Sequence, residues 1–246
     1  MNTTPTPTPN PNVTLDTLFE HIKIRGGRSQ RAVILAWILA TRNNVPAPIL
    51  VITGPSSSLA LTRLNALVSS APVMRGAIPE PWWAVMQIFA SASQHERVVA
   101  FDETQDSIDT RTLWHIAQLV QGWTLARHFD ARELFIRANV MLATNWPYGW
   151  RDKFGEGMSY LVGISTVKST GEKRWEQEKP GIMWALLELD ARVAAALGST
   201  WVDTDLQIAP MREFCRILDA VDQVLNGTHG LALYRTEAMA FGDGKE

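Results

Sequence analysis

The chain has 246 residues, of which 46% are hydrophobic and 20% are charged, so it can fold around a substantial buried core. Its formal net charge of −2 excludes a uniformly basic surface, and any contact with nucleic acid must therefore come from a local basic patch. A single cysteine, Cys215, excludes an internal disulfide and a multi-cysteine zinc site, and its position on the apolar stripe of a predicted helix indicates a buried, unreactive thiol.

The first residues, MNTTPTPTPNPN, repeat Thr-Pro and contain neither the basic nor the apolar part of a signal peptide. Residues 1–13 are therefore predicted to form an extended, solvated arm. The longest strongly apolar run, residues 32–40, has nine residues, whereas a membrane-spanning helix needs about 20. We expect a cytoplasmic protein with no membrane partner.

Residues 14–46 have the spacing of a helical segment, which is interrupted at Gly26-Gly27. Ser29 is the predicted N-cap of the apolar helix that follows the interruption, because a serine hydroxyl can accept a hydrogen bond from a free backbone N–H of the first turn.

Continuous aliphatic runs near residues 48–53, 97–102, 139–144 and 160–165 predict strands that are buried on both faces. Because helical patterns alternate with them, residues 47–167 are expected to form an α/β core around one mostly parallel sheet. Between the second and third strands, residues 123–140 predict a hairpin with a polar tip near Asp130.

The loop 168–181 mixes charges of both signs and is predicted to be solvated. Helical patterns follow at residues 182–198 and 210–227, the latter with Asn226-Gly227 as its stop signal. Residues 168–246 are therefore expected to form a small helical lid after the core.

A candidate nucleotide-binding turn follows the first strand, where strand, loop and helix arrive in the order of a phosphate-binding loop. The motif G-x-x-x-x-G-K-[ST] would need Gly at 59, Lys at 60 and Ser or Thr at 61, and Thr62 comes one place too late to replace the hydroxyl. The glycine, the lysine and the hydroxyl are thus all missing. The candidate turn consists of Gly54, Pro55, Ser56, Ser57, Ser58, Leu59, Ala60, Leu61 and Thr62.

Polar residues end two of the predicted strands, Asp102-Glu103 after one and Asn145 after another. In P-loop ATPases an Asp at such a place holds Mg²⁺, a neighbouring Glu orients the attacking water, and a polar residue on the adjacent strand contacts the γ-phosphate. Asp102 is therefore the candidate metal ligand, and Glu103 and Asn145 are the candidate catalytic residues. A solvated strand end and a turn residue are the alternative interpretations.

Together these segments resemble the AAA+ ATPases of phages and mobile elements, which are relatives of the superfamily-three helicases and primase-helicases. The resemblance runs from about Arg31 to Ile164 and rests on three stretches: RAVILAWILAT…PAPILVITGPSSS, ERVVAFDETQDSIDTRTLWHIAQLVQGWTLARHFDARELF and RANVMLATN. It implies a P-loop NTPase (AAA+-like) fold and assembly as a homo- or hetero-oligomer with AAA+ subunits.

The resemblance also implies that the hairpin meets single-stranded DNA through Arg127, His128 and Arg132, and that Arg151 is a candidate arginine finger. A solvated β-ribbon and a surface loop with ordinary charges are the alternatives for these two segments.

We therefore expect a degenerate helicase-like ATPase subunit associated with the DNA replication of a phage or mobile element. Because the phosphate-binding lysine is missing, ATP hydrolysis should be defective, with either no cofactor or weak binding of ATP and Mg²⁺. The alternative is a non-catalytic module that binds intact homologues or another replication protein.

Overall fold

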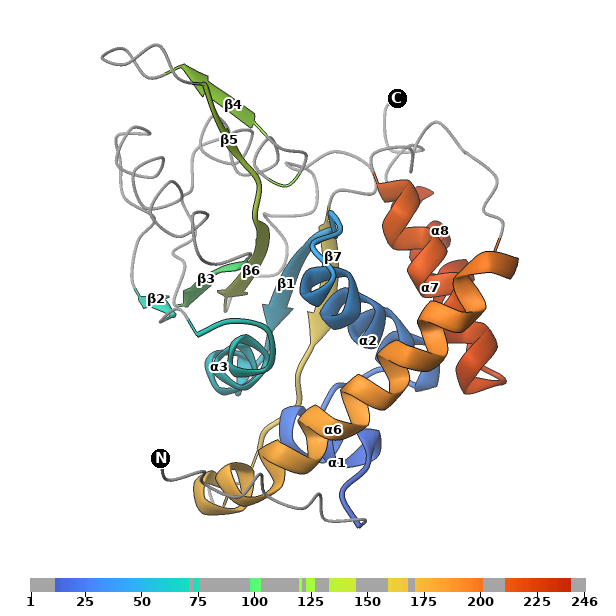
Figure 1. Ribbon diagram of the computed structural model, residues 1–246. Helices are drawn as coiled ribbons and strands as arrows, with labels where there is room; N and C mark the ends of the chain where they lie inside the picture. Colours follow the sequence, from blue (N-terminus) through green and yellow to red (C-terminus); the bar gives the residue numbers. More distant parts are fainter. Residues whose placement is uncertain are drawn as a thin grey trace, which may run out of the picture.

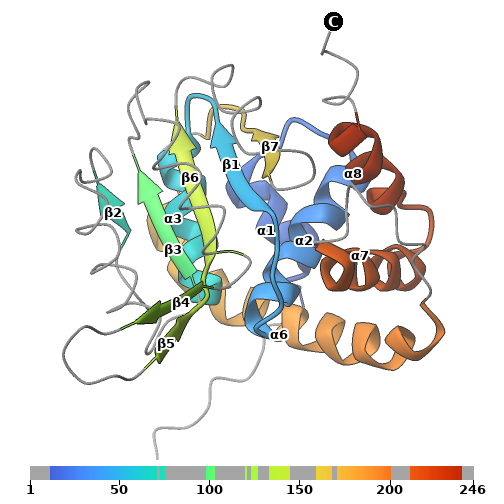
Figure 2. The ribbon, with the colours of Figure 1, turned by 90° about the horizontal axis from the view of Figure 1, so that it is seen from above.

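The computed structural model describes residues 12–70, 73–75, 98–102, 120, 123–126, 133–144, 159–167, 171–200 and 211–239. Its centre is a five-stranded, all-parallel sheet with the strand order β2-β3-β6-β1-β7 (Figures 1 and 2). The strands are β1 Ile49–Thr53, β2 Met74–Arg75, β3 Val98–Asp102, β6 Asn139–Thr144 and β7 Ser159–Gly163.

The middle of the sheet confirms the expected buried strands. All residues of β1, β3 and β6 are buried, as their continuous aliphatic runs predict for a sheet covered on both faces. Val51 of β1 is in register with Leu142 of β6 on one side and with Leu161 of β7 on the other. The sequence did not predict β2, because two residues are too few to show a periodic pattern.

Helices cover the sheet and extend beyond its β7 edge. The helices are α1 Leu15–Ile22, α2 Arg28–Arg42, α3 Ser57–Val68, α6 Glu172–Ala196, α7 Arg212–Leu225 and α8 Gly230–Met239, with a 3-10 turn at Leu197–Ser199. Of these, α3 packs against β1, β3 and β6, while α2, α7 and α8 pack together beside β7. The long helix α6 runs along the outside, against α1 and α7 (Figure 1).

Helix α2 is the most deeply buried helix among the described residues. Every residue from 32 to 40 is at most 2% exposed, and Trp37 Nε1 donates a hydrogen bond to the carbonyl of Pro48 at 2.8 Å. The predicted N-cap is wrong, because the helix begins at Arg28 after Gly27. Ser29 lies inside the first turn, where its hydroxyl accepts a hydrogen bond from the backbone N–H of His229 at 3.1 Å.

The expected solvated loop at 168–181 is also wrong from residue 172 onward, because α6 begins at Glu172 and continues through Pro180. Its charged residues are the solvent side of a helix, with Arg174 and Glu178 paired one turn apart at 3.0 Å. The other side is apolar and packs into the core through Trp175, Ile182, Leu186, Leu189 and Val193.

The end of α7 confirms the predicted stop at Asn226-Gly227, since both residues have positive φ, 47° and 80°. Helix α8, which follows, was not predicted. Its N-terminus is capped from α7 by Asp222, whose carboxylate accepts hydrogen bonds from the backbone N–H groups of Gly230 and Leu231, each at 2.9 Å. A cap that comes from another helix leaves no local signal in the sequence.

The predicted hairpin is confirmed in its two arms, β4 Trp123–Ala126 and β5 Glu133–Ile136, which pair antiparallel as a separate two-stranded sheet. The tip between them lies outside the described residues. Arg137 and Asn139 fix the base of the hairpin where it continues into β6. The Arg137 guanidinium donates a hydrogen bond to the carbonyl of Asn44.

Asn139 is 5% exposed and connects the start of β6 to the segment between α2 and β1. Its Oδ1 accepts a hydrogen bond from the N–H of Ala47 at 3.0 Å, and its Nδ2 donates to Thr41 Oγ1 at 3.0 Å and to the carbonyl of Val45 at 2.9 Å. One buried side chain therefore satisfies three polar groups that would otherwise be costly to bury.

Cys215 lies in α7 and is fully buried, as predicted. Burial raises the pKa of its thiol to about 12, so the reactive thiolate is not populated at neutral pH. Across the described residues, no helix is both long enough and apolar enough to span a membrane.

We predict that Asn139→Ala lowers the free energy of unfolding by about 2–4 kcal/mol, because three buried partners lose their hydrogen bonds. Urea unfolding measures the loss. Gln177→Ala, at an exposed position on α6, is the control and should change stability by no more than about 0.5 kcal/mol. Equal effects of the two substitutions would contradict the role given to Asn139.

Candidate functional site

The candidate nucleotide-binding turn is shorter than the sequence predicts. Strand β1 ends at Thr53 and α3 begins at Ser57, so only residues 54–56 connect them. Of the candidate turn over residues 54–62, only residues 54–56 therefore form a turn. Ser58, Leu59 and the three residues that follow them lie within the helix.

Gly54 has a φ of +116°, a conformation that side chains rarely adopt. A Cβ atom at this position would lie 2.3 Å from the carbonyl oxygen of Ile164, just after β7. The glycine is therefore required for two reasons, its backbone angle and the close approach of the chain after β7.

Hydrogen bonds close the turn on the same side. The N–H of Ile164 donates to the carbonyl of Thr53 at 2.7 Å, and the N–H of Val167 donates to the hydroxyl of Ser56 at 2.9 Å. The N–H of Ser57 donates back to the carbonyl of Gly54 at 3.1 Å. The N–H of Ser57 and the hydroxyl of Ser56, which are groups of the kind that a phosphate-binding loop presents to its ligand, thus already take part in hydrogen bonds within the protein.

Positions 60 and 61 hold a lysine and a hydroxyl residue in a working motif, but they are apolar in this chain. Ala60 and Leu61 are fully buried in the hydrophobic core, and the N–H of Ala60 donates to the carbonyl of Ser56 at 3.0 Å. The hydroxyl of Thr62 donates to the carbonyl of Ser58 at 2.9 Å. Positions 60 and 61 therefore present neither the lysine nor the hydroxyl that the working motif has there.

Asp102, the candidate metal ligand, ends β3 and is 1% exposed. It lies at the carboxyl edge of the sheet, like Gly54, and only β6 separates their strands. Arg75 of β2, its neighbour in register, places Nε 3.9 Å from Asp102 Oδ2. Arg75 was not predicted as a site residue, because β2 is too short to leave a pattern in the sequence. A guanidinium near the carboxylate supplies part of the positive charge that a metal ion would bring.

The remaining predicted site residues lie outside the described residues, so their placement stays a prediction. They are Glu103, Asn145, Arg127, His128, Arg132 and Arg151. Among the described residues, no group of three His, Cys, Asp or Glu could hold a metal ion.

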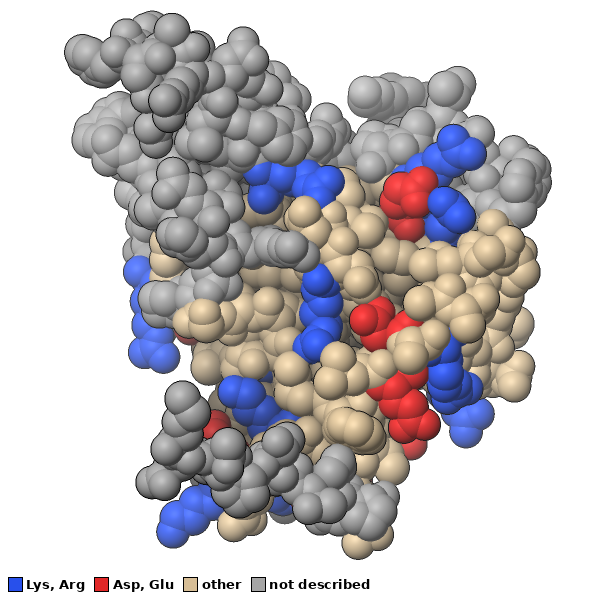
Figure 3. Space-filling model, in the orientation of Figure 1, with Lys and Arg blue, Asp and Glu red and all other residues tan. Residues whose placement is uncertain are grey.

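The two ends of the sheet carry different candidate features. The turn at Gly54 and Asp102 lie where the parallel strands end, whereas the hairpin joins β6 where that strand begins. The hairpin and the turn are therefore on opposite edges. On the face drawn in Figure 3, the described basic and acidic residues are interspersed and form no broad patch of one sign.

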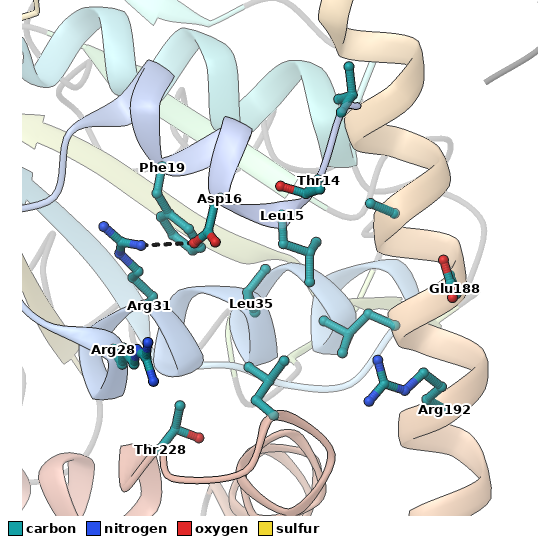
Figure 4. Close-up of a pocket in the computed structure, with 14 residues that line it drawn as sticks. Thr14, Leu15, Asp16, Phe19, Arg28, Arg31, Leu35, Glu188, Arg192 and Thr228 are labelled. Carbon is teal, nitrogen blue, oxygen red and sulfur yellow. Dashed lines mark hydrogen bonds and ion pairs between the residues drawn. The ribbon is translucent and has the colours of Figure 1, made fainter. Parts of the chain in front are cut away.

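A separate hollow of about 460 Å³ lies between α1, α2 and α6 (Figure 4). Its floor is apolar, with Leu15, Leu35 and Leu189, and its rim is charged. Arg31 on this rim is paired with Asp16 at 3.0 Å and stacks over the Phe19 ring. This pair and the ring contact occupy Arg31 within the protein, so Arg31 does not by itself define a ligand site.

Comparisons with known proteins give a fold relationship only. No family model matches the sequence, and no curated protein is similar to it. The apo A-form structure of the C-terminal region of NrS-1, a phage primase-helicase, has a TM-score of 0.51 and 11% sequence identity. The alignment covers 92% of this chain and 56% of that one, so the chain spans little more than half of its neighbour. The similarity concerns the fold.

Two further structures of the same NrS-1 region, spanning its residues 305–718, have lower scores. One has a TM-score of 0.45 at 10% identity and covers 73% of the NrS-1 chain. The other has a TM-score of 0.46 at 9% identity and covers 75% of the NrS-1 chain.

We predict that three glycine-to-alanine substitutions separate backbone strain from steric overlap. Gly54→Ala meets both a positive φ and the Ile164 carbonyl, Gly227→Ala meets a positive φ with open space around it, and Gly198→Ala meets neither. The loss of unfolding free energy should follow that order, with about 1–2 kcal/mol for Gly227→Ala and more for Gly54→Ala. Chemical denaturation tests the order, and a Gly54→Ala protein as stable as the Gly198→Ala protein would refute the closed turn.

Proposed function

We propose that this chain is a helicase-like subunit of the DNA-replication apparatus of a phage or mobile element, and that it does not hydrolyse ATP. The fold similarity to the C-terminal region of NrS-1 supports the replication part of the proposal. The strand order supports the helicase-like part. Strand β1, which precedes Gly54, and strand β3, which ends at Asp102, are separated only by β6.

The closed turn between β1 and α3 is the observation that supports the proposed lack of ATP hydrolysis. Phosphoryl transfer depends on a positioned cation and on hydrogen bonds to the phosphates. In this chain the position of the lysine is Ala60, inside the core, and the hydroxyl of Ser56 already accepts a hydrogen bond. The partial charge of a helix N-terminus is worth about 0.3–1 kcal/mol and cannot replace a lysine and a metal ion.

In this proposal the hairpin is the part that contacts single-stranded DNA, through Arg127, His128 and Arg132. Its base is anchored independently of the turn, since Arg137 and Asn139 bind the segment between α2 and β1. Loss of nucleotide chemistry at one edge of the sheet therefore leaves the support of the hairpin intact.

We predict no magnesium-dependent ATP hydrolysis above background and a dissociation constant for ATP no tighter than about 0.1 mM. Phosphate release and calorimetric titration with Mg-ATP measure the two quantities. The variant Glu103→Gln separates true turnover from a contaminating ATPase, because only turnover by this chain would disappear. Steady hydrolysis by the wild type that this variant abolishes would refute the proposal.

For DNA, the triple variant Arg127→Ala/His128→Ala/Arg132→Ala should weaken single-stranded DNA binding about tenfold or more. Because each phosphate contact releases a counterion, the slope of log K against log salt should flatten by about 1.4 for two lost contacts. Fluorescence anisotropy at several salt concentrations measures both quantities.

The matched control is Lys173→Ala/Arg212→Ala, which also removes two positive charges, but from exposed positions on α6 and α7. It should leave the slope unchanged. A wild-type chain that does not bind DNA at low salt would contradict the DNA part of the proposal and favour a non-catalytic interaction module.

A further inference from the structure

The connection between α1 and α2 lies in a long stretch of sequence without acidic residues. Between Glu20 and Glu80 there are 59 residues and none is Asp or Glu, although these two types make up 25 of the 246 residues of the chain. The same stretch contains seven Lys and Arg residues, and four of them fall within the segment 23–31, KIRGGRSQR. This segment is therefore a concentrated cationic region in a chain whose net charge is −2.

The backbone of this segment is fixed to the edge of the sheet. The N–H of Arg25 donates to the carbonyl of Gly163 at 2.8 Å, and the carbonyl of Lys23 accepts a hydrogen bond from the chain after β7 at 2.9 Å. Between them Ile24 pairs antiparallel with Ile164 and packs against the hydrophobic core. Because side chains alternate along an extended chain, Arg25 points away from the side that Ile24 occupies.

The charged groups of Arg25 and Arg28 are directed to solvent. The stem of Arg25 lies over Gly163, where an added Cβ atom would be 3.4 Å from Arg25 Cδ, while the residue as a whole is exposed. The stem is thus packed and the guanidinium stays in water. Arg28 is exposed in the first turn of α2, which contains no acidic residue. Because a positive charge is unfavourable in the first turn of a helix, α2 gains no stability from the charge of Arg28.

The two exposed acids of α1 are already paired with other cations. Asp16 binds Arg31 at 3.0 Å, and Glu20 binds Arg174 at 2.6 Å. Figure 4 joins Arg31 to Asp16 by a dashed line and shows no such line to Arg28. Across the part of the chain that the structure describes, three neighbouring cations therefore have no ion pair: Lys23, Arg25 and Arg28.

The spacing of these cations suits the phosphates of one DNA strand. Lys23 and Arg28 are five residues apart, so their Cα atoms are at most about 17 Å apart. Along the axis of duplex DNA each strand has a phosphate about every 3.4 Å, so that length contains about five phosphates. Sites for single strands also stack bases on exposed aromatic rings. The large hydrophobic residues that the described surface exposes, Trp184 and Leu187, both lie on α6, so the cationic segment itself fits a duplex better than a single strand.

We propose that Lys23, Arg25 and Arg28 bind the phosphate backbone of duplex DNA. The inference rests on DNA as the partner in the proposed function, but it does not involve the hairpin. Arg28 begins α2, whereas Asn44, which accepts the hydrogen bond from the base of the hairpin, lies just beyond the end of this helix. The 15 residues of α2 span about 22 Å. A duplex at one end of α2 and a single strand on the hairpin beyond the other end correspond to the two parts of a DNA fork.

Fluorescence anisotropy with a blunt duplex of about 16 base pairs tests the contact, and the wild type should bind it at low salt with a dissociation constant of about 1–100 μM. Arg25→Gln/Arg28→Gln removes two charges, so it should weaken binding about tenfold or more and flatten the slope of log K against log salt by about 1.8. Arg25→Lys/Arg28→Lys keeps both charges and should keep the slope. The matched control is Arg212→Gln/Arg216→Gln, which removes two charges from α7 and should leave the slope unchanged. Circular dichroism of the loop variants should remain that of the wild type, because both positions are exposed.

A single strand of the same length separates this inference from the proposed function. Arg25→Gln/Arg28→Gln should leave the affinity for the single strand unchanged, and the hairpin variant Arg127→Ala/His128→Ala/Arg132→Ala should leave the affinity for the duplex unchanged. A wild type that binds the single strand but not the duplex overturns the inference and leaves the proposed function intact, whereas binding to neither overturns both. Duplex binding that the glutamine variant does not weaken, or that the lysine variant weakens equally, overturns the inference as well.

Discussion

The buried guanidinium of Arg63 is the group on which the arrangement of α1, α3 and α6 depends. Arg63 lies on α3 and is 2% exposed, with Nη1 donating to the carbonyl of His21 at 2.8 Å. Its Cζ lies 5.5 Å from the centre of the Trp175 ring on α6. Burial lowers the pKa of Arg63, and the charge of Glu172 opposes that shift. A cation this deep is tolerable only while α1 and α6 both provide partners.

His21 of α1 also contributes to the contact between α1 and α6. Its Nε2 lies 2.8 Å from Oε2 of Glu178, and its ring meets Trp175 edge to face. Burial alone would raise the pKa of Glu178, but hydrogen bonds from Arg174 and His21 outweigh burial and lower it. A carboxylate whose pKa is lower in the folded than in the unfolded protein stabilises the fold at pH values above its unfolded pKa. This stabilisation is lost as the pH falls through the lowered pKa of the folded state. The long outer helix α6 is therefore held to α1 by ionic contacts as well as by packing.

How much of the structure the sequence predicts depends on whether the contacts are local. The aliphatic strands around Val51 and Leu142 were predicted because burial on both faces leaves a continuous pattern. Arg63 could not be distinguished from a surface arginine, since its partners come from α1 and α6. The same holds for the candidate site. Gly54 was expected in a turn. The contact with Ile164 that closes this turn could not be predicted, because Ile164 lies far along the sequence, after β7.

The sheet order also governs how the chain folds. Strand β1 pairs with β6 and β7, so its hydrogen bonds cannot be completed before residue 163 has been synthesised. From Thr53 to Gly163 the ribosome adds 110 residues, which takes about 6–22 seconds at 5–20 residues per second. During that interval the apolar α2 and β1 have been synthesised, but the strands that later pair with β1 have not. Translation of this chain therefore includes an aggregation-prone stage, during which a chaperone that shields residues 32–53 would raise the yield of folded protein.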